Sequence, residues 1–180
     1  TKLRTGDWWG NGEPIHISAI RGKDSVKLGS IKHVMFNNII CKGENQILLF
    51  GTPESVIEDV SFQNIRFELT DSKLNDVAGG NIDLRGVSGI KNGLFKSDIA
   101  GIQMQYVKDV RMQDVVLTWS NTRMPYFTHG LQLQHFENVL VKDCDLSSSP
   151  INKKAYRIDA EDGKNFSTDN KTNVQSINVK

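Results

Sequence analysis

A short pattern of apolar residues recurs along this 180-residue chain, and it limits the folds that the chain can adopt. Residues 31–41 and 57–67 match position by position, and looser copies begin at Val107 and Phe136. Within each copy, apolar residues alternate with polar ones, skip one place, and then alternate again. One added residue reverses the facing of every later side chain in a strand, so the chain must bend at the skip if both halves face inward.

The residue at the skip is always Asn or Asp: Asn38, Asn64, Asp114 and Asp143. These are the non-glycine residues that best tolerate the left-handed backbone conformation, which lets one residue turn the chain between two strands. An antiparallel sandwich with Asn in its turns explains four equal offsets less well. The pattern therefore predicts an all-β solenoid, a right-handed parallel β-helix.

A third short strand is expected in each coil, because a further stretch of alternating apolar and polar residues follows each repeated pair. The copies start 26 residues apart (57 − 31), then 50 (107 − 57), then 29 (136 − 107), so the double interval predicts a degenerate coil within residues 87–106. Residues 1–180 are interpreted as a single partial β-helix domain of about five to six coils. The third strands are expected at 15–18, 46–50, 81–85, 102–105, 131–134 and 157–159.

Composition argues against several functional classes. The 22 basic residues nearly balance the 21 acidic ones, which leaves no excess charge for binding nucleic acid. No run of 18 apolar residues is present, so no membrane span is expected. Cys41 and Cys144 occupy apolar strand positions without the spacing of metal ligands, and no cofactor motif occurs, so neither a metal nor a cofactor is expected.

The third strands are expected to present one polar face, on which side chains from successive coils line up into ladders. Amides and ion pairs on such a face hydrogen-bond sugar hydroxyls, and Arg85 and Arg157 suit carboxylates. A merely solvated polar face explains the same residues, and both interpretations stay open. The first expected ladder contains His16, Leu48, Asp83, Gln103, Gln132 and Arg157, and the second contains Ser18, Phe50, Arg85, Gln105, Gln134 and Asp159.

Two loops lead into this face and add candidate binding residues. Residues 6–14 place Trp8 and Trp9 among glycines, followed by Glu13, and exposed aromatic rings of this kind stack on sugars. Packing of either tryptophan against the edge of the coil is the alternative. Residues 118–130 carry several aromatic residues and His129, the latter within a Thr-His-Gly triplet.

No catalytic motif stands out in the sequence. The chain has no Gly-x-Ser-x-Gly, no His-Glu-x-x-His and no Cys-x-x-Cys. Glycoside hydrolysis needs two carboxyl groups that flank one bond. Asp83 and Asp159 are expected several coils apart, so they are not predicted to act together.

Three segments carry a resemblance to a known family: residues 12–17 (Gly-Glu-Pro-Ile-His-Ile), residues 31–39, and residues 51–65, which open with Gly-Thr-Pro-Glu. Together they resemble glycoside hydrolase family 28, the polygalacturonases and related pectin-degrading enzymes, best over residues 12–67 and more loosely to the end. The resemblance implies a pectin lyase-like β-helix and inverting hydrolysis, by aspartates, of polysaccharides that contain uronic acid or rhamnose. Because such polysaccharides are too large to enter a cell intact, the enzyme is expected to be secreted or periplasmic. The full-length parent protein is expected to be a monomer.

The catalytic motifs of that family do not occur in this chain. They are Asn-Thr-Asp, Asp-Asp, Gly-His-Gly and Arg-Ile-Lys, and the triplet that contains His129 comes too late in the order of the coils to match the third. The resemblance therefore implies that this segment forms the C-terminal coils, with the catalytic aspartates upstream. A non-catalytic glycan-binding β-helix, as in adhesins or phage tailspikes, is the first alternative. A polysaccharide lyase is the second, and it would need an acidic calcium site and a basic proton abstractor.

Overall fold

The computed structural model describes residues 12–73, 75–85, 93–169 and 177–179, and its main element is one ten-stranded sheet in which every strand pair is parallel. A separate antiparallel pair is formed by β5 (Asn81–Asp83) and β6 (Leu94–Lys96), and α1 (Asn75–Ala78) is a single turn. The strands of the main sheet are β1 (His16–Ser18), β2 (Ile31–Gly43), β3 (Ile47–Phe50), β4 (Ile57–Thr70), β7 (Ile102–Ser120), β8 (Leu131–Lys142), β9 (Asp145–Leu146), β10 (Ile158–Glu161), β11 (Lys164–Thr168) and β12 (Ile177–Val179).

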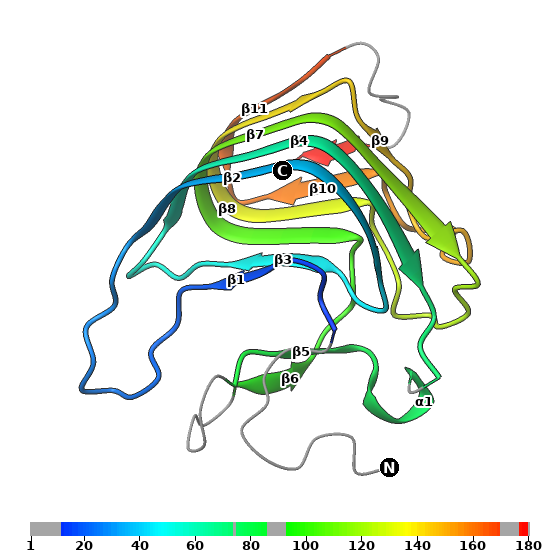
Figure 1. The fold of residues 1–180 in the computed structure, drawn as a ribbon, viewed down its shortest axis with the longest axis horizontal. Coiled ribbons are helices and arrows are strands. Elements are labelled where there is room, and N and C mark those ends of the chain that lie inside the picture. The colour runs from blue at the N-terminus through cyan, green and yellow to red at the C-terminus, as the bar shows by residue number, and fades with distance from the viewer. Residues whose placement is uncertain (1–11, 74, 86–92, 170–176, 180) are drawn as a thin grey trace.

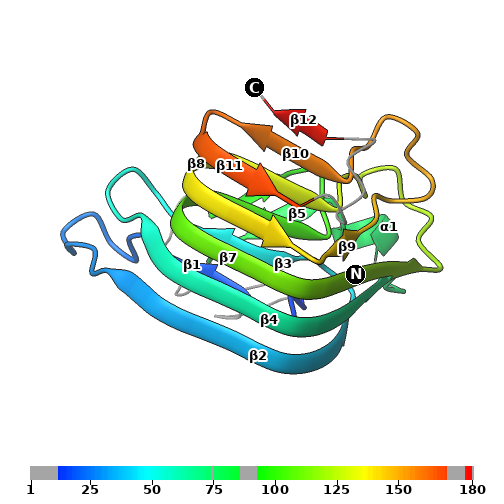
Figure 2. The same cartoon turned by 90° about the horizontal axis from the view of Figure 1, so that it is seen from above.

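The sheet is curled, so that its long strands form two parts that face each other (Figure 1). We call the lower part the front sheet: β1, β3, residues 102–105 of β7, residues 131–134 of β8, β10 and β12. The upper part is the arc: β2, β4, residues 107–120 of β7, residues 136–142 of β8, β9 and β11. Figure 2 shows the arc strands lying side by side in the order of their pairing. The chain is therefore all-β with a curled parallel sheet, as the repeat predicts.

Bends within the arc occur at residues with left-handed backbone. Asn38, Asn64, Asp114 and Asp143 have φ angles of 57°, 52°, 53° and 52°, which confirms the bend predicted at the skip. A second set of left-handed residues, absent from the sequence-based prediction, lies earlier in the same strands. Its members are His33, Asp59, Asp109, Asn138 and Asn165. The signal for it is the spacing of three between inward residues such as Ile31 and Val34, which reverses facing in the same way.

The core lies between the arc and the front sheet. Phe62, Phe67 and Val139 of the arc and Met104 and Leu133 of the front sheet belong to one continuous buried cluster. Burial of each large apolar side chain contributes about 1.5–3 kcal/mol. Within the described chain, β2 pairs only with β4, and its inward residues are only half-buried.

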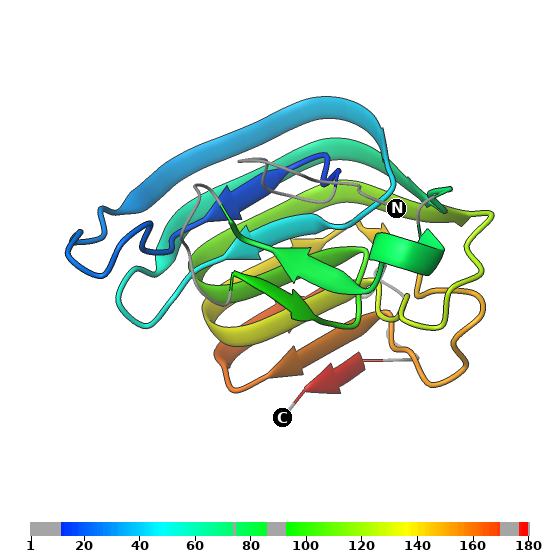
Figure 3. The ribbon, with the colours of Figure 1, turned by 90° about the horizontal axis from the view of Figure 1, so that it is seen from below.

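The degenerate coil expected within residues 87–106 is not formed. β4 pairs directly with β7, with Ile57 opposite Val107, so the doubled interval comes from an insertion. The described residues between 71 and 98 lie outside the main sheet and contain α1 and the β5–β6 pair, which Figure 3 shows against the front strands. Residues 81–85 are thus not a third strand. The described residues also contain no helix long and apolar enough to cross a membrane.

Candidate functional site

The outward face of the front sheet carries the ladder that the sequence predicts, with two changes of membership. His16 lies opposite Leu48, followed by Gln103, Gln132 and Asp159 in successive strands. Asp83 is absent because β5 belongs to the insertion, and Asp159 stands where Arg157 was expected. A register error of two residues keeps every side chain on its predicted face, so the alternation of apolar residues cannot reveal it.

The second ladder changes in the same way. It runs through Ser18, Phe50, Gln105, Gln134 and Glu161, so Glu161 takes the place expected for Asp159, and Arg85 is not a member. The sequence-based choice of site residues omitted Glu161. Glu161 could have been found from the sequence, because it lies two residues after Asp159 and therefore faces the same side of the strand.

Part of this face is covered rather than wet. Leu48 is fully buried and packs with Ile82 and Leu84 of the insertion, while Ile20 and Phe50 border the same small cluster. The rings of Phe50 and Phe95 also lie 6.2 Å apart between centroids. The expectation of a continuous wet ladder is therefore wrong at β3, because the insertion between β4 and β7 returns to cover it.

His129, Tyr156 and Asp159 form a polar group beside β10. The Nδ1 atom of His129 accepts the backbone N–H of Tyr156 at 2.9 Å, which places the proton of the neutral ring on Nε2. Nε2 lies 3.7 Å from Oδ2 of Asp159, and the His129 and Tyr156 rings stack with centroids 5.7 Å apart. The side chains of His129 and Asp159 are 17% and 9% exposed. A donor and an acceptor thus face each other across a gap longer than a hydrogen bond.

Arg157 lies at the edge of this group and is paired with Asp145. Its NH1 donates to Oδ1 of Asp145 at 2.9 Å. About one third of the Arg157 side chain and two thirds of the Asp145 side chain are exposed, at 32% and 65%. An exposed pair of this kind contributes about 0–1 kcal/mol to stability, so another carboxylate can exchange with Asp145 at small cost.

Glu13 and His16 occupy the other end of the first ladder. Oε2 of Glu13 lies 3.6 Å from Nδ1 of His16, and Nδ2 of Asn45 donates to Oε1 of Glu13 at 3.4 Å. Both side chains of the Glu13–His16 pair are almost completely buried. The two candidates are therefore together, but far from His129 along the ladder. Trp8 and Trp9 lie outside the described residues.

Asp83 and Arg85 pair with each other inside the insertion. Nε of Arg85 donates to Oδ1 of Asp83 at 2.9 Å and NH2 donates to Oδ2 at 2.7 Å, while the Arg85 backbone N–H adds a third bond at 3.1 Å. The hydrogen bond to Asp83 raises the pKa of Arg85. Because the Asp83 side chain is 1% exposed and its oxygens are engaged, this pair orders the insertion and does not present a carboxylate to a ligand.

Two buried glutamines lack hydrogen-bond partners within the described part of the chain. They are Gln46, at the side-chain atoms Nε2 and Oε1, and Gln103, at Oε1. A buried polar atom without a partner costs about 1–3 kcal/mol, which water or a ligand can offset. Gln103 belongs to the first ladder, two strands from Asp159.

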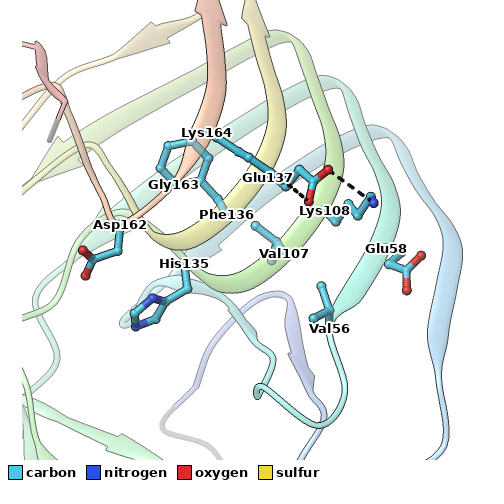
Figure 4. A pocket seen from close by; sticks show the side chains of 10 residues that line it. All are labelled: Val56, Glu58, Val107, Lys108, His135, Phe136, Glu137, Asp162, Gly163 and Lys164. Atoms are coloured by element: carbon cyan, nitrogen blue, oxygen red, sulfur yellow. Dashed lines mark ion pairs between the residues drawn. The ribbon is translucent and has the colours of Figure 1, made fainter.

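A groove of about 490 Å³ lies at the bend that joins the front sheet to the arc (Figure 4). We call it the bend groove. Beside it runs a ladder of alternating charge on the arc: Lys32, Glu58, Lys108, Glu137 and Lys164. Lys32 lies 2.9 Å from Glu58, and Glu137 lies 3.4 Å from Lys108 and 3.3 Å from Lys164. Lys164, followed by Lys108, holds the pKa of Glu137 below its ordinary value. The sequence-based analysis did not single out this groove.

Among the described residues, no group of three His, Cys, Asp or Glu side chains is arranged to hold a metal ion. Comparisons of the chain with known protein families, with curated proteins and with solved structures find no match.

Proposed function

We propose that the curled sheet is a stretch of right-handed parallel β-helix with three strands per coil. One strand of each coil belongs to the front sheet and two belong to the arc, separated by the bends at Asn38, Asn64, Asp114 and Asp143. The unbroken parallel register from β2 through β4, β7 and β8 supports this reading. Neighbouring coils then repeat at about 4.8 Å, the spacing of paired strands.

The function that this architecture supports best is polysaccharide binding on the front sheet, within the C-terminal coils of a secreted or periplasmic glycoside hydrolase. The observation that carries it is the arrangement of His129 and Asp159. With Nε2 and Oδ2 3.7 Å apart, one sugar hydroxyl can accept from the first and donate to the second, each at about 2.8 Å. Such a pair selects a hydroxyl over an apolar group, because an apolar group can neither accept from Nε2 nor donate to Oδ2.

The proposed substrate is a pectic glycan containing uronic acid or rhamnose. The ladder next to His129 offers amides for hydroxyls at Gln103 and Gln132, and Arg157 offers a guanidinium for a uronate in exchange for Asp145. The catalytic aspartates are proposed to lie upstream. Within this chain, Asp159 and Glu161 are the carboxylates on the two ladders, and they are assigned to binding.

Titration of the 180-residue chain with oligogalacturonate, followed by calorimetry, tests the binding step. We expect Asp159→Asn and His129→Gln each to weaken binding roughly tenfold, as for loss of one buried hydrogen bond, and the exposed control Asp98→Asn to leave it unchanged. Equal affinity in all four proteins would reject the site.

Depolymerisation of a panel of pectic polysaccharides by the full-length parent tests the hydrolase. Cleavage by the parent and none by this segment is the expected result. Binding without cleavage by the parent would favour the non-catalytic glycan-binding alternative.

A further inference from the structure

The insertion closes one end of the outward face of the front sheet. Leu48 of β3 belongs to the first ladder, yet it is fully buried because Ile82 and Leu84 of the insertion pack on it. Phe50, the next outward residue of β3, borders the same cluster, and its ring lies 6.2 Å from that of Phe95 between centroids. We call Ile82, Leu84 and Phe95 the end wall. Figure 3 shows β5 and β6 lying over the front strands.

The insertion that carries the end wall is attached to the loop at residues 118–130. Asp71 accepts hydrogen bonds from the backbone N–H and Nε of Arg123, at 3.0 and 2.8 Å, and from Nδ2 of Asn75, at 2.9 Å. Only 6% of the Asp71 side chain is exposed. An added Cβ at Gly79 would clash with the Tyr126 side chain, so the backbone there lies directly on that ring. These contacts make the end wall a fixed part of the fold.

Coverage of the first ladder decreases with distance from the end wall. Gln103 lies in β7, the strand next to β3, and is only 5% exposed. Gln132 and Gln134 of β8, the following strand, are half-buried, so a ligand can reach their amides. Asp159 lies one strand further, in β10. Since neighbouring strands are about 4.8 Å apart, β10 and β3 are separated by about 14 Å, a short stretch of face with one closed end.

The closed end determines which part of a glycan chain can bind. At the proposed site the glycan lies across the strands, from Asp159 toward Gln103. The interior of a long chain would have to continue over β3, where Ile82 and Leu84 already pack on Leu48. A chain end needs no room beyond this point.

We propose that the front-sheet site binds the end of a glycan chain, with the terminal sugar next to the end wall and the rest of the chain leading away past β10. This inference rests on the proposed function for the class of ligand and for the site at His129 and Asp159. Strand β1 lies on the far side of β3. A chain held in this way therefore leads away from the coils proposed upstream, so the site anchors the glycan and is not part of their cleft.

The number of proteins bound per glycan chain tests this inference. The 180-residue chain is titrated by calorimetry with tetragalacturonate and with a long, size-fractionated polygalacturonate. Because each glycan chain has one end of the recognised kind, we expect one protein per chain for both ligands. A number of proteins that grows with chain length would overturn the inference and leave the proposed function intact. Absence of binding to either ligand would overturn both.

Modification of the two ends of the oligosaccharide tests recognition of the terminal sugar. One tetragalacturonate is reduced with borohydride at its reducing end, and another carries an unsaturated sugar at its non-reducing end. We expect one of these changes to weaken binding roughly tenfold, as for loss of a buried hydrogen bond, and the other to have little effect. Unchanged affinity for both modified ligands would overturn the inference.

A pair of leucine variants tests the end wall itself. Leu84→Asn puts an amide into the buried cluster on Leu48 and is expected to detach the insertion there. Leu94→Asn is the matched control, because Leu94 lies in β6 of the same insertion and is 46% exposed. With the wall detached, the number of proteins per long polygalacturonate chain is expected to rise in Leu84→Asn and to stay at one in Leu94→Asn. A ratio of one in both variants would contradict the role of the wall.

Discussion

Strands β2 and β4 carry the same sequence pattern in perfect register, yet their inward residues differ in burial. Ile57, Val60, Phe62, Ile65 and Phe67 are buried in β4, while their partners Ile31, Val34, Phe36, Ile39 and Cys41 in β2 are half-buried. β4 lies between β2 and β7, whereas β2 has one described neighbour. The comparison shows that a repeat sets the facing of a side chain, and that the number of neighbouring strands sets its burial.

The largest expected effect is on the stacked pair Phe36 and Phe62, whose ring centroids lie 5.1 Å apart. Phe62→Ala should lower the free energy of unfolding by about 3–5 kcal/mol, because it leaves a cavity inside the curled sheet. Phe36→Ala should cost about 1–2 kcal/mol, since its ring is already half in water. Urea unfolding measures both values, and equal losses would contradict the role of neighbouring strands.

The bend residues of β2 and β4 are expected to behave alike, because their backbone conformation does not depend on burial. Asn38 and Asn64 have similar left-handed φ angles of 57° and 52°. Alanine at either position should cost about 1–2 kcal/mol in unfolding free energy, and glycine less, because glycine adopts positive φ without strain. Asn64→Ala also removes the amide that donates to Asn38 at 2.7 Å. A negligible cost at both positions would mean that the bends do not need left-handed residues.

A smaller effect is expected from the ion pair that links the two strands. Lys42 of β2 donates to Glu68 of β4 at 2.6 Å, and this bond, with one from Ser120, lowers the pKa of Glu68 from 4.5. A lowered folded-state pKa contributes stability above pH 4.5 that is lost as pH falls through the folded value. Glu68→Gln and Lys42→Met should each flatten the pH dependence of the unfolding free energy below about pH 4.5. An unchanged pH profile in both variants would count against the pair.

The least perturbing test uses the two cysteines, which are both free thiols. Burial raises the pKa of Cys144 to about 11, and it also raises the pKa of the half-buried Cys41. Because thiolate and access both limit alkylation, iodoacetamide at pH 8 should modify Cys41 first and Cys144 only after unfolding. Peptide mass analysis over time follows both sites. Faster modification of Cys144 would show that the β2 end is better covered than the strand pairing indicates.

The sequence predicts the inner face of this molecule well and its outer face less well. Apolar spacing and the Asn or Asp at each skip are local signals, so the bends at Asn38, Asn64, Asp114 and Asp143 are predicted correctly. The position of Asp83 depends on where the insertion packs. The replacement of Arg157 by Asp159 in the first ladder depends on strand register. Neither can be read from the spacing of apolar residues.

The alternation of Lys32, Glu58, Lys108, Glu137 and Lys164 also has a consequence for misfolding. Repeated strands invite a specific error, in which one strand is left out and its two neighbours pair with each other. Pairing β2 directly with β7 would set Lys32 against Lys108, and pairing β4 with β8 would set Glu58 against Glu137. Like charges directly opposite each other destabilise a strand pair. The hydrophobic pattern is the same in successive strands of the arc, so the alternating charges on the outer surface are what distinguishes each strand from the next.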